Sequence, residues 1–314
     1  MPQPTYPVKQ VDPPLPPRET LPTMYDLPSE NPEEPGLPDE YHDLQPQLLS
    51  RTLCSPCYPP QRVFTGTVLN LFYDVRHTQW YKRPDWFLVV GISRLYEERD
   101  LRSSYVVWQE GVNPFVVVEL LSPGTAKEDL GENAELEAEV EPSVTASKSS
   151  STPAIAEPEK DNGQAAKETP PRKWDVYEKI LRVPYYVVFS RYTNRVHFFK
   201  LVGGHYQEQA LDPENPRVWI PELEVGLGLW QGEYEGIERQ WLRWYDDQGN
   251  WIPTDTEQER QEKELALSRA NQAESQLQQV VLNLLQQGMT VEQVAIITGF
   301  SEEQVQRLSQ ESGE

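Results

Sequence analysis

Two carboxylates in strongly apolar segments are the residues best suited to chemistry. Asp85 directly precedes WFLVVGIS, residues 86–93, and Glu119 lies inside PFVVVELLS, residues 114–122. A carboxylate within a buried strand is costly unless a cation or hydrogen-bond donors accompany it. If the two segments form neighbouring strands, the acids converge on one point and offer the hard oxygen ligands that Mg²⁺ or Mn²⁺ prefers. We therefore expect Asp85 and Glu119 to be metal ligands.

An amine is available in the segment KWDVYEKIL, residues 173–181, which begins with Lys173. This segment has helical apolar periodicity, so we expect a helix that buries one face. The expected buried face consists of Trp174, Tyr177, Ile180 and Leu181. A lysine beside a metal-bound water positions that water or offsets phosphate charge, so Lys173 is the third candidate catalytic residue beside Asp85 and Glu119. Lys127 is another candidate amine, and Asp129 is an additional candidate acid.

Each of these residues also has a purely structural interpretation. Asp85 follows a proline and fits a turn that precedes a strand. Glu119 fits a structural ion pair with an arginine or lysine, and Lys173 fits a solvent-facing position in the first turn of a helix. The residue types alone leave these alternatives open.

Histidine and cysteine give weaker signals. His42, His77, His197 and His205 are scattered without metal-ligand spacing, which indicates surface or structural roles. Cys54 and Cys57 form a single C-x-x-C with no second pair, so ordinary thiols in a reducing compartment are the default interpretation. We accordingly expect a cytoplasmic protein.

The elements that must position the acids alternate between strands and helices. Strands are predicted over residues 68–74, 86–93, 104–109, 114–122 and 185–191, and helices over 41–53 and 174–181. A hairpin with the turn Gly203-Gly204 follows, and then tryptophan-rich strands within residues 217–251. This order predicts an α/β domain over residues 41–255.

Two segments differ from this domain in composition. Residues 1–40 contain twelve of the 29 prolines and are expected to form an extended or disordered leader. Residues 126–172 are acidic and of low complexity, and we expect a solvated loop inserted into the domain. Each segment has a net charge of −6, so the rest of the chain contributes −10 of the total of −22. An acidic surface disfavours nucleic acid unless a local basic cleft exists.

The C-terminal part is predicted to be helical. Apolar residues in steps of four and three predict a heptad seam on a long helix over residues 256–288, and with it a homodimer through residues 257–288. The seam residues are Ala266, Ala270, Ala273, Leu277, Val280 and Leu284. The tail, residues 289–314, contains two capping-box sequences and resembles a small helix-turn-helix. Arg307 is its only basic residue, which favours a protein contact over DNA.

Several phrases of the sequence resemble a known family. YKRPDW, SYVVWQEGV, VVELLSPGT, KWDVYEKILRVPYYVVF and GLGLWQG are similar to the Uma family of restriction-endonuclease-like proteins (domain of unknown function 820). The resemblance covers roughly residues 40–255. It implies the PD-(D/E)-x-K nuclease fold, a mixed sheet flanked by helices, here with a C-terminal helical extension.

The resemblance also implies roles for individual residues. Asp85 and Glu119 match the two metal ligands of the family, Lys173 its helix lysine and Asp129 the acid between them. Tyr177 matches a helix tyrosine that is expected to pack rather than react. The usual E-x-K pattern would place a lysine at position 121, where this chain has Leu121.

These observations predict a Mg²⁺- or Mn²⁺-dependent endonuclease that hydrolyses DNA phosphodiester bonds. A basic rim near the acids would favour it; the candidate residues are Lys82, Arg83, Arg94, Arg99, Arg102 and Lys173. The alternative is an inactive descendant of the fold that serves as a binding or scaffold module through its coiled coil. A third interpretation is a cleft that binds another kind of ligand. No run of 18 apolar residues exists, so no membrane partner is expected.

Overall fold

The structure is a computed structural model that describes residues 39–121, 125–134 and 169–311. The predicted leader, apart from its last two residues, and the central part of the predicted insert lie outside the described residues. The chain divides into two compact units, Met1–Ile252 and Pro253–Glu314.

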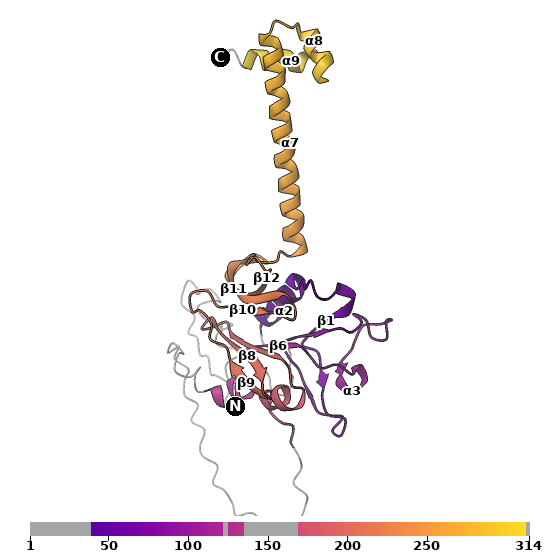
Figure 1. Cartoon of the computed structure of the whole chain (residues 1–314), viewed down its shortest axis with the longest axis vertical. Helices are drawn as coiled ribbons and strands as arrows, with labels where there is room; N and C mark the ends of the chain where they lie inside the picture. Colours follow the sequence, from indigo (N-terminus) through magenta and orange to yellow (C-terminus); the bar gives the residue numbers. More distant parts are fainter. Residues whose placement is uncertain (1–38, 122–124, 135–168, 312–314) are drawn as a thin grey trace, which may run out of the picture. The chain divides into compact units, whose positions relative to one another are not determined.

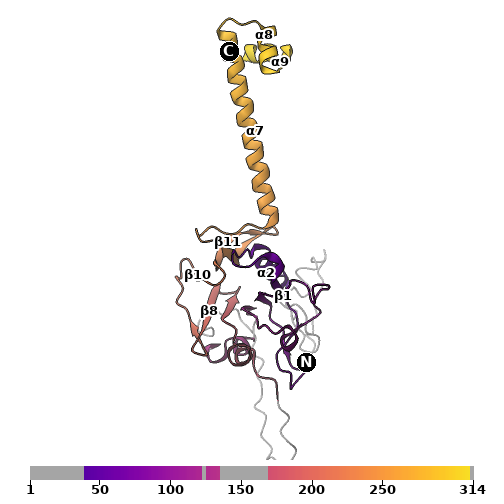
Figure 2. The ribbon, with the colours of Figure 1, turned by 45° about the vertical axis from the view of Figure 1, so that its right-hand side comes forward.

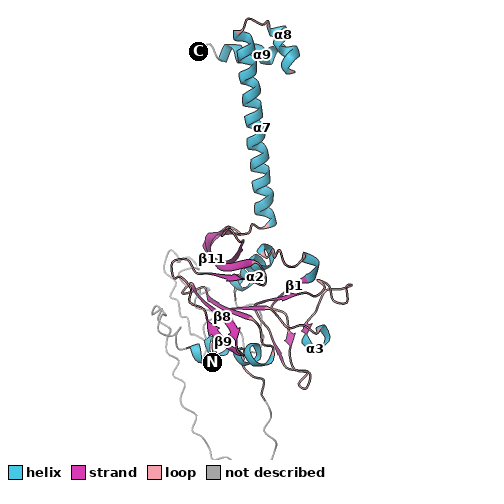
Figure 3. Cartoon of the chain, viewed as in Figure 1, coloured by secondary structure: helices cyan, strands magenta, loops and turns pink. Residues whose placement is uncertain are grey.

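A six-stranded mixed sheet forms the centre of the first unit (Figures 1 and 3). Its strand order is β1-β4-β6-β7-β8-β9. The strands are β1 (Val63–Thr67), β4 (Trp86–Val90), β6 (Val116–Leu120), β7 (Tyr185–Ser190), β8 (Arg195–Val202) and β9 (His205–Glu208). β6 and β7 pair in parallel, and the other neighbours are antiparallel. The prediction of an α/β unit with a mixed sheet and a C-terminal helical region is therefore confirmed.

Both faces of this sheet are covered, which explains the nearly continuous apolar sequence of β6 and β7. One face packs against helix α2 (Glu40–Thr52) and a three-stranded sheet. That sheet contains β10 (Arg217–Ile220), β11 (Val225–Tyr234) and β12 (Ile237–Tyr245). The opposite face packs against the helical segment before β7 and a small sheet. The small sheet contains β2 (Leu71–Phe72), β3 (Tyr81–Lys82) and β5 (Tyr105–Val106).

The side chain of Gln45 joins α2 to β12. Its Nε2 donates to the Leu242 carbonyl and its Oε1 accepts from the Leu242 N–H, both at 2.8 Å. The amide thus extends the hydrogen-bonding pattern of a strand. Since α2 carries His42, this junction also fixes one residue of the site described below.

The helical segment before β7 differs from the predicted regular helix. It begins as α6 (Lys173–Asp175) and continues as a π-helical turn, η3 (Val176–Ile180), in which Leu181 N–H bonds the Val176 carbonyl at 2.8 Å. Tyr177 and Leu181 are buried as expected, but Ile180 is 42 % exposed. A π turn widens the helix by one residue, so the 3.6-residue periodicity places Ile180 on the wrong side.

The structure also differs from the predictions in other segments. Strand β1 was not predicted. A Cβ on its Gly66 would lie 2.3 Å from the Phe87 ring, so this strand requires glycine. The predicted strand 104–109 ends at Val106 and becomes helix α3 (Val107–Glu110), closed by Gly111 at φ 74°.

The start of the predicted loop 126–172 is also ordered. It forms α4 (Ala126–Asp129) and a 3₁₀ turn, η2 (Gly131–Ala134). Asp129 and Leu130 are buried, because Leu130 joins the apolar cluster between the sheet and η3. The acidic composition led to the prediction of a loop for a short segment that is part of the folded domain.

The second unit consists of α7 (Asp255–Gln286), α8 (Val291–Thr298) and α9 (Glu302–Glu311). Helices α8 and α9 fold back against the C-terminal end of α7 around the small core Val281, Val294 and Val305 (Figure 2). Thr290 with Gln293, and Ser301 with Gln304, make the two predicted capping boxes. Among the described residues no helix is both long and apolar enough to cross a membrane.

Candidate functional site

Asp85 and Glu119 meet at the edge where β4 pairs with β6. Trp86 and Val118 are partners in this antiparallel ladder, so the next pair brings the two acids together. Asp85 N–H donates to Glu119 Oε2 at 3.3 Å, and Leu120 N–H donates to Asp85 Oδ2 at 2.7 Å. The expectation that the acids lie on neighbouring strands and converge is confirmed.

Lys173 extends from the first turn of α6 into this acid pair. Its Nζ lies 2.9 Å from Glu119 Oε2 and 3.0 Å from Asp129 Oδ1, and its side chain is only 20 % exposed. The backbone N–H of Lys173 also donates to Glu128 Oε1 at 3.0 Å. The lysine is therefore not a solvent-facing residue, and it draws Asp129 of α4 into the site.

Tyr177 orients the carboxylate of Glu119 from the π turn. Its hydroxyl donates to Glu119 Oε1 at 2.7 Å, while Oε2 receives Lys173, so both oxygens of this fully buried carboxylate are engaged. Nearby, the Tyr186 hydroxyl donates to the Asp129 carbonyl at 2.8 Å. Tyr177 therefore packs, as the resemblance implies, and also serves as a hydrogen-bond donor.

Burial and nearby negative charge raise the pKa values of Glu119 and Asp85. Burial raises the pKa of Glu119 to about 8, against the attraction of Lys173 and with the help of Asp129 and Asp85. Burial likewise raises the pKa of Asp85. Burial alone would lower the pKa of Lys173, but attraction to the three acids holds it well above its ordinary value. One ammonium thus interacts with three carboxyl groups, and their competition for it favours the protonated form of Glu119.

His42 is a site neighbour that the sequence did not indicate. It is buried, with Nδ1 2.9 Å from Asp39 Oδ1 and Nε2 3.1 Å from the Leu120 carbonyl. Both partners are acceptors, so both ring nitrogens donate and the ring is an imidazolium. Burial lowers its pKa, but Asp39 and Asp85 raise it to a net increase. Arg191 completes the group at 2.6 Å from Asp39 Oδ2.

A weak sequence signal for His42 existed. Asp39 is the N-cap of α2, and its side chain accepts from the His42 N–H at 3.1 Å. An Asp followed three residues later by His at a helix start places the two side chains side by side. The expectation of a surface or structural role for His42 is corrected in one respect: this histidine is in the interior, next to the acids.

The acid cluster provides some of the oxygen ligands that a divalent cation needs. Carboxylate oxygens of Asp85, Glu119 and Asp129 are the hard ligands that Mg²⁺ prefers. Asp129 Oδ1 is buried without a hydrogen bond, since its 3.0 Å approach to Lys173 lacks hydrogen-bond geometry. Yet among the described residues no three His, Cys, Asp or Glu side chains are grouped to hold a metal. The Lys173 ammonium lies between two of the acids, so a bound cation would have to displace it.

Three residues of the predicted basic rim, Lys82, Arg102 and Lys173, are paired with acids. Lys82 is near the site but pairs with Glu128 at 2.7 Å. Arg102 is buried in a two-bond ion pair with Glu110, at 2.7 and 3.0 Å. These two residues are therefore neutralised by acids, and Lys173 is directed inward.

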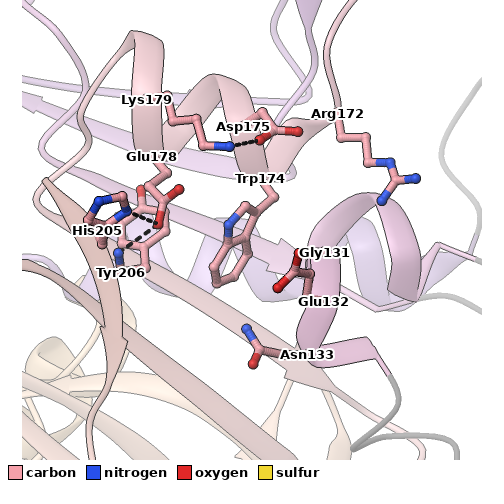
Figure 4. A pocket seen from close by; sticks show the side chains of 10 residues that line it. All are labelled: Gly131, Glu132, Asn133, Arg172, Trp174, Asp175, Glu178, Lys179, His205 and Tyr206. Carbon is pink, nitrogen blue, oxygen red and sulfur yellow. Dashed lines mark hydrogen bonds and ion pairs between the residues drawn. The ribbon is translucent and has the colours of Figure 1, made fainter.

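A separate hollow of about 430 Å³ is lined by residues of α6, η3, η2 and the start of β9 (Figure 4). Three of its charged side chains have partners within the lining. Lys179 bonds Asp175 at 2.6 Å, and Glu178 accepts from the Tyr206 N–H at 2.8 Å. Since Lys173, Glu119 and Asp85 do not line this hollow, it is distinct from the acid cluster.

No protein-family model matches the chain, and no curated protein matches it significantly. The resemblance to the Uma family therefore stays a prediction, and the functional argument depends on the geometry of Asp85, Glu119 and Lys173.

Proposed function

We propose that the protein is a metal-dependent endonuclease that hydrolyses phosphodiester bonds in DNA. The observation that carries this proposal is the convergence of Asp85, Glu119 and Lys173 at one edge of a mixed sheet. Lys173 contacts Glu119 directly, and Asp85 reaches Glu119 through its backbone N–H. Two carboxylates and an amine are the residue types that metal-assisted phosphoryl chemistry requires. Asp129, with its buried oxygen lacking a hydrogen bond, supports the same interpretation.

In this proposal Asp85 and Glu119 would hold Mg²⁺ or Mn²⁺. When bound, such a cation would lower the pKa of a water molecule and neutralise phosphate charge. Lys173, released from Glu119, would contribute its positive charge to the phosphate. Tyr177 keeps Glu119 oriented through Oε1, and His42 holds the Leu120 carbonyl at the end of the same strand.

A second candidate is a non-catalytic module that retains the fold. It is favoured by one specific observation: Lys173 already neutralises Glu119 and Asp129, in the position that a cation would take. In that case the cluster is a structural ion-pair network, and the function belongs to the surfaces of the molecule.

The experiment that separates the two is a plasmid cleavage assay with the full chain in Mg²⁺, Mn²⁺ or EDTA, together with titration calorimetry of each metal. The endonuclease is expected to cleave only with metal, and Glu119→Gln to abolish both cleavage and heat of binding. Glu222→Gln is the matched control, because Glu222 also accepts a tyrosine hydroxyl, that of Tyr185 at 2.6 Å, away from the acids.

Binding of neither metal by wild-type protein, with no cleavage, would reject the endonuclease and leave the non-catalytic module. Metal binding that survives in Glu119→Gln would show that the cation is held elsewhere.

A further inference from the structure

Helix α7 is exposed over most of its length. Within its own unit, every residue from 258 to 277 is exposed to solvent, and contacts with α8 and α9 begin only near Val281. A helix of 32 residues extends about 48 Å, at 1.5 Å per residue. Helices in proteins gain most of their stability from packing an apolar face. A long helix without such packing indicates a missing partner.

The apolar positions of α7 fix the shape of that partner. Steps of four and three from Ala266 to Val280 define heptad positions a and d, with Ala270 and Leu277 at a and Ala273 at d. Leu277 and Val280 are 37 % and 44 % exposed, although they are the largest apolar side chains on the free part of the seam. A period of 3.5 residues is that of a left-handed supercoil, so the expected partner is another helix.

The charged positions beside the seam select an identical helix in parallel register. In a parallel coiled coil, a residue at g faces the residue at e five positions later on the partner. Here Arg269 at g would face Glu274 at e, and Asp255 at g would face Arg260 at e. Two-fold symmetry doubles each pair. No such pair joins like charges, since Glu262 would face Leu267.

We propose that α7 forms a parallel, in-register coiled coil with α7 of a second copy of this chain, over residues 255–280. The same register places two charged residues in the seam, Glu259 at d and Lys263 at a. A polar residue at an a position, such as Lys263, fixes register and oligomeric state at some cost in stability. The seam stops before Val281, where α8 and α9 already cover the helix. This dimer is independent of the proposed nuclease activity.

Charge reversal of the full chain tests this dimer. Sedimentation velocity at low ionic strength is expected to give twice the mass of one chain for the wild type. Arg269→Glu and Glu274→Arg each turn two attractive pairs into repulsive ones, so each alone should raise the dissociation constant about tenfold. An equimolar mixture of the two variants should restore it, because unlike chains again pair opposite charges.

Glu264→Arg is the matched control for Glu274→Arg. It makes the same change in charge at an exposed position away from the seam and should leave the mass unchanged. Leu277→Glu is expected to abolish the dimer while far-UV circular dichroism of the chain is retained. A monomeric wild type, or a mixture that fails to restore the dimer, would overturn the proposal. A dimer that Ile296→Ser disrupts and Leu277→Glu does not would also overturn the proposal. That result would place the interface on the apolar patch of α8, where Ile296 is 84 % exposed.

Discussion

Replacing Glu119 by glutamine should flatten the dependence of folding stability on pH. Burial raises the pKa of Glu119 from 4.5 to about 8. Between these values the folded protein holds a proton that the unfolded chain has released. Stability from this group is therefore complete below pH 4.5 and is lost as the pH rises through about 8.

The size of the effect follows from the same two values. A difference of 3.5 pH units, from 4.5 to about 8, corresponds to at most about 5 kcal/mol at about 1.4 kcal/mol per unit. Asp85 and Asp129 compete for the same Lys173 ammonium, so part of the loss remains after the substitution. We expect the glutamine variant to remove about 2–3 kcal/mol of the loss between pH 5 and pH 8.

Urea unfolding at several pH values between 5 and 8 measures this directly. Glutamine cannot titrate, yet it retains an oxygen that can accept from Tyr177, so the variant should fold. Glu222→Gln leaves the acid cluster untouched and should follow the wild-type curve. Parallel curves for wild type and Glu119→Gln would show that the carboxyl of Glu119 does not titrate between pH 5 and 8, and the account of the cluster would be wrong.

Three further substitutions test separate parts of the structure. His42→Phe should lower the free energy of unfolding by roughly 1–3 kcal/mol at pH 6 and by less at pH 9. The raised pKa of His42 gives stability that is complete below pH 6.5 and is lost as the pH rises through the pKa of the folded state. Equal losses in urea unfolding at both pH values would contradict this. Tyr177→Phe should lower stability by about 1 kcal/mol through loss of the bond to Glu119, and an unchanged thermal midpoint would argue against that bond. Gly226→Ala should lower the free energy of unfolding by about 1–3 kcal/mol, since its Cβ would lie 1.9 Å from the Tyr245 ring. Adding Tyr245→Leu should recover part of the thermal midpoint, and a double variant without recovery would refute this clash.

The sequence predicted those parts of the site that depend on strand pattern. Asp85 and Glu119 were found because a carboxylate in an apolar strand is exceptional, and alternation along β4 and β6 places both on one face of the sheet. Lys173 was found because it begins an amphipathic segment. The resemblance pointed to the same three residues.

Other parts depend on contacts between distant segments and could not be predicted. His42 reaches the site only because α2 crosses the end of β6, 78 residues away in sequence. The place of Ile180 depends on a π turn, whose extra residue leaves no mark in composition. Gly66 resembles a strand breaker until the ring of Phe87 is seen to occupy the space of its missing side chain.

Parallel pairing of β6 with β7 joins parts of the chain on either side of residues 135–168. Lys173 adds a second link across the same interval, through its contacts with Glu128 and Asp129. Both links consist of non-covalent contacts between residues on either side of the interval, so neither requires the intervening peptide bonds to be intact. A protease nick within residues 135–168 should therefore leave two fragments that co-elute in gel filtration and separate only on denaturation.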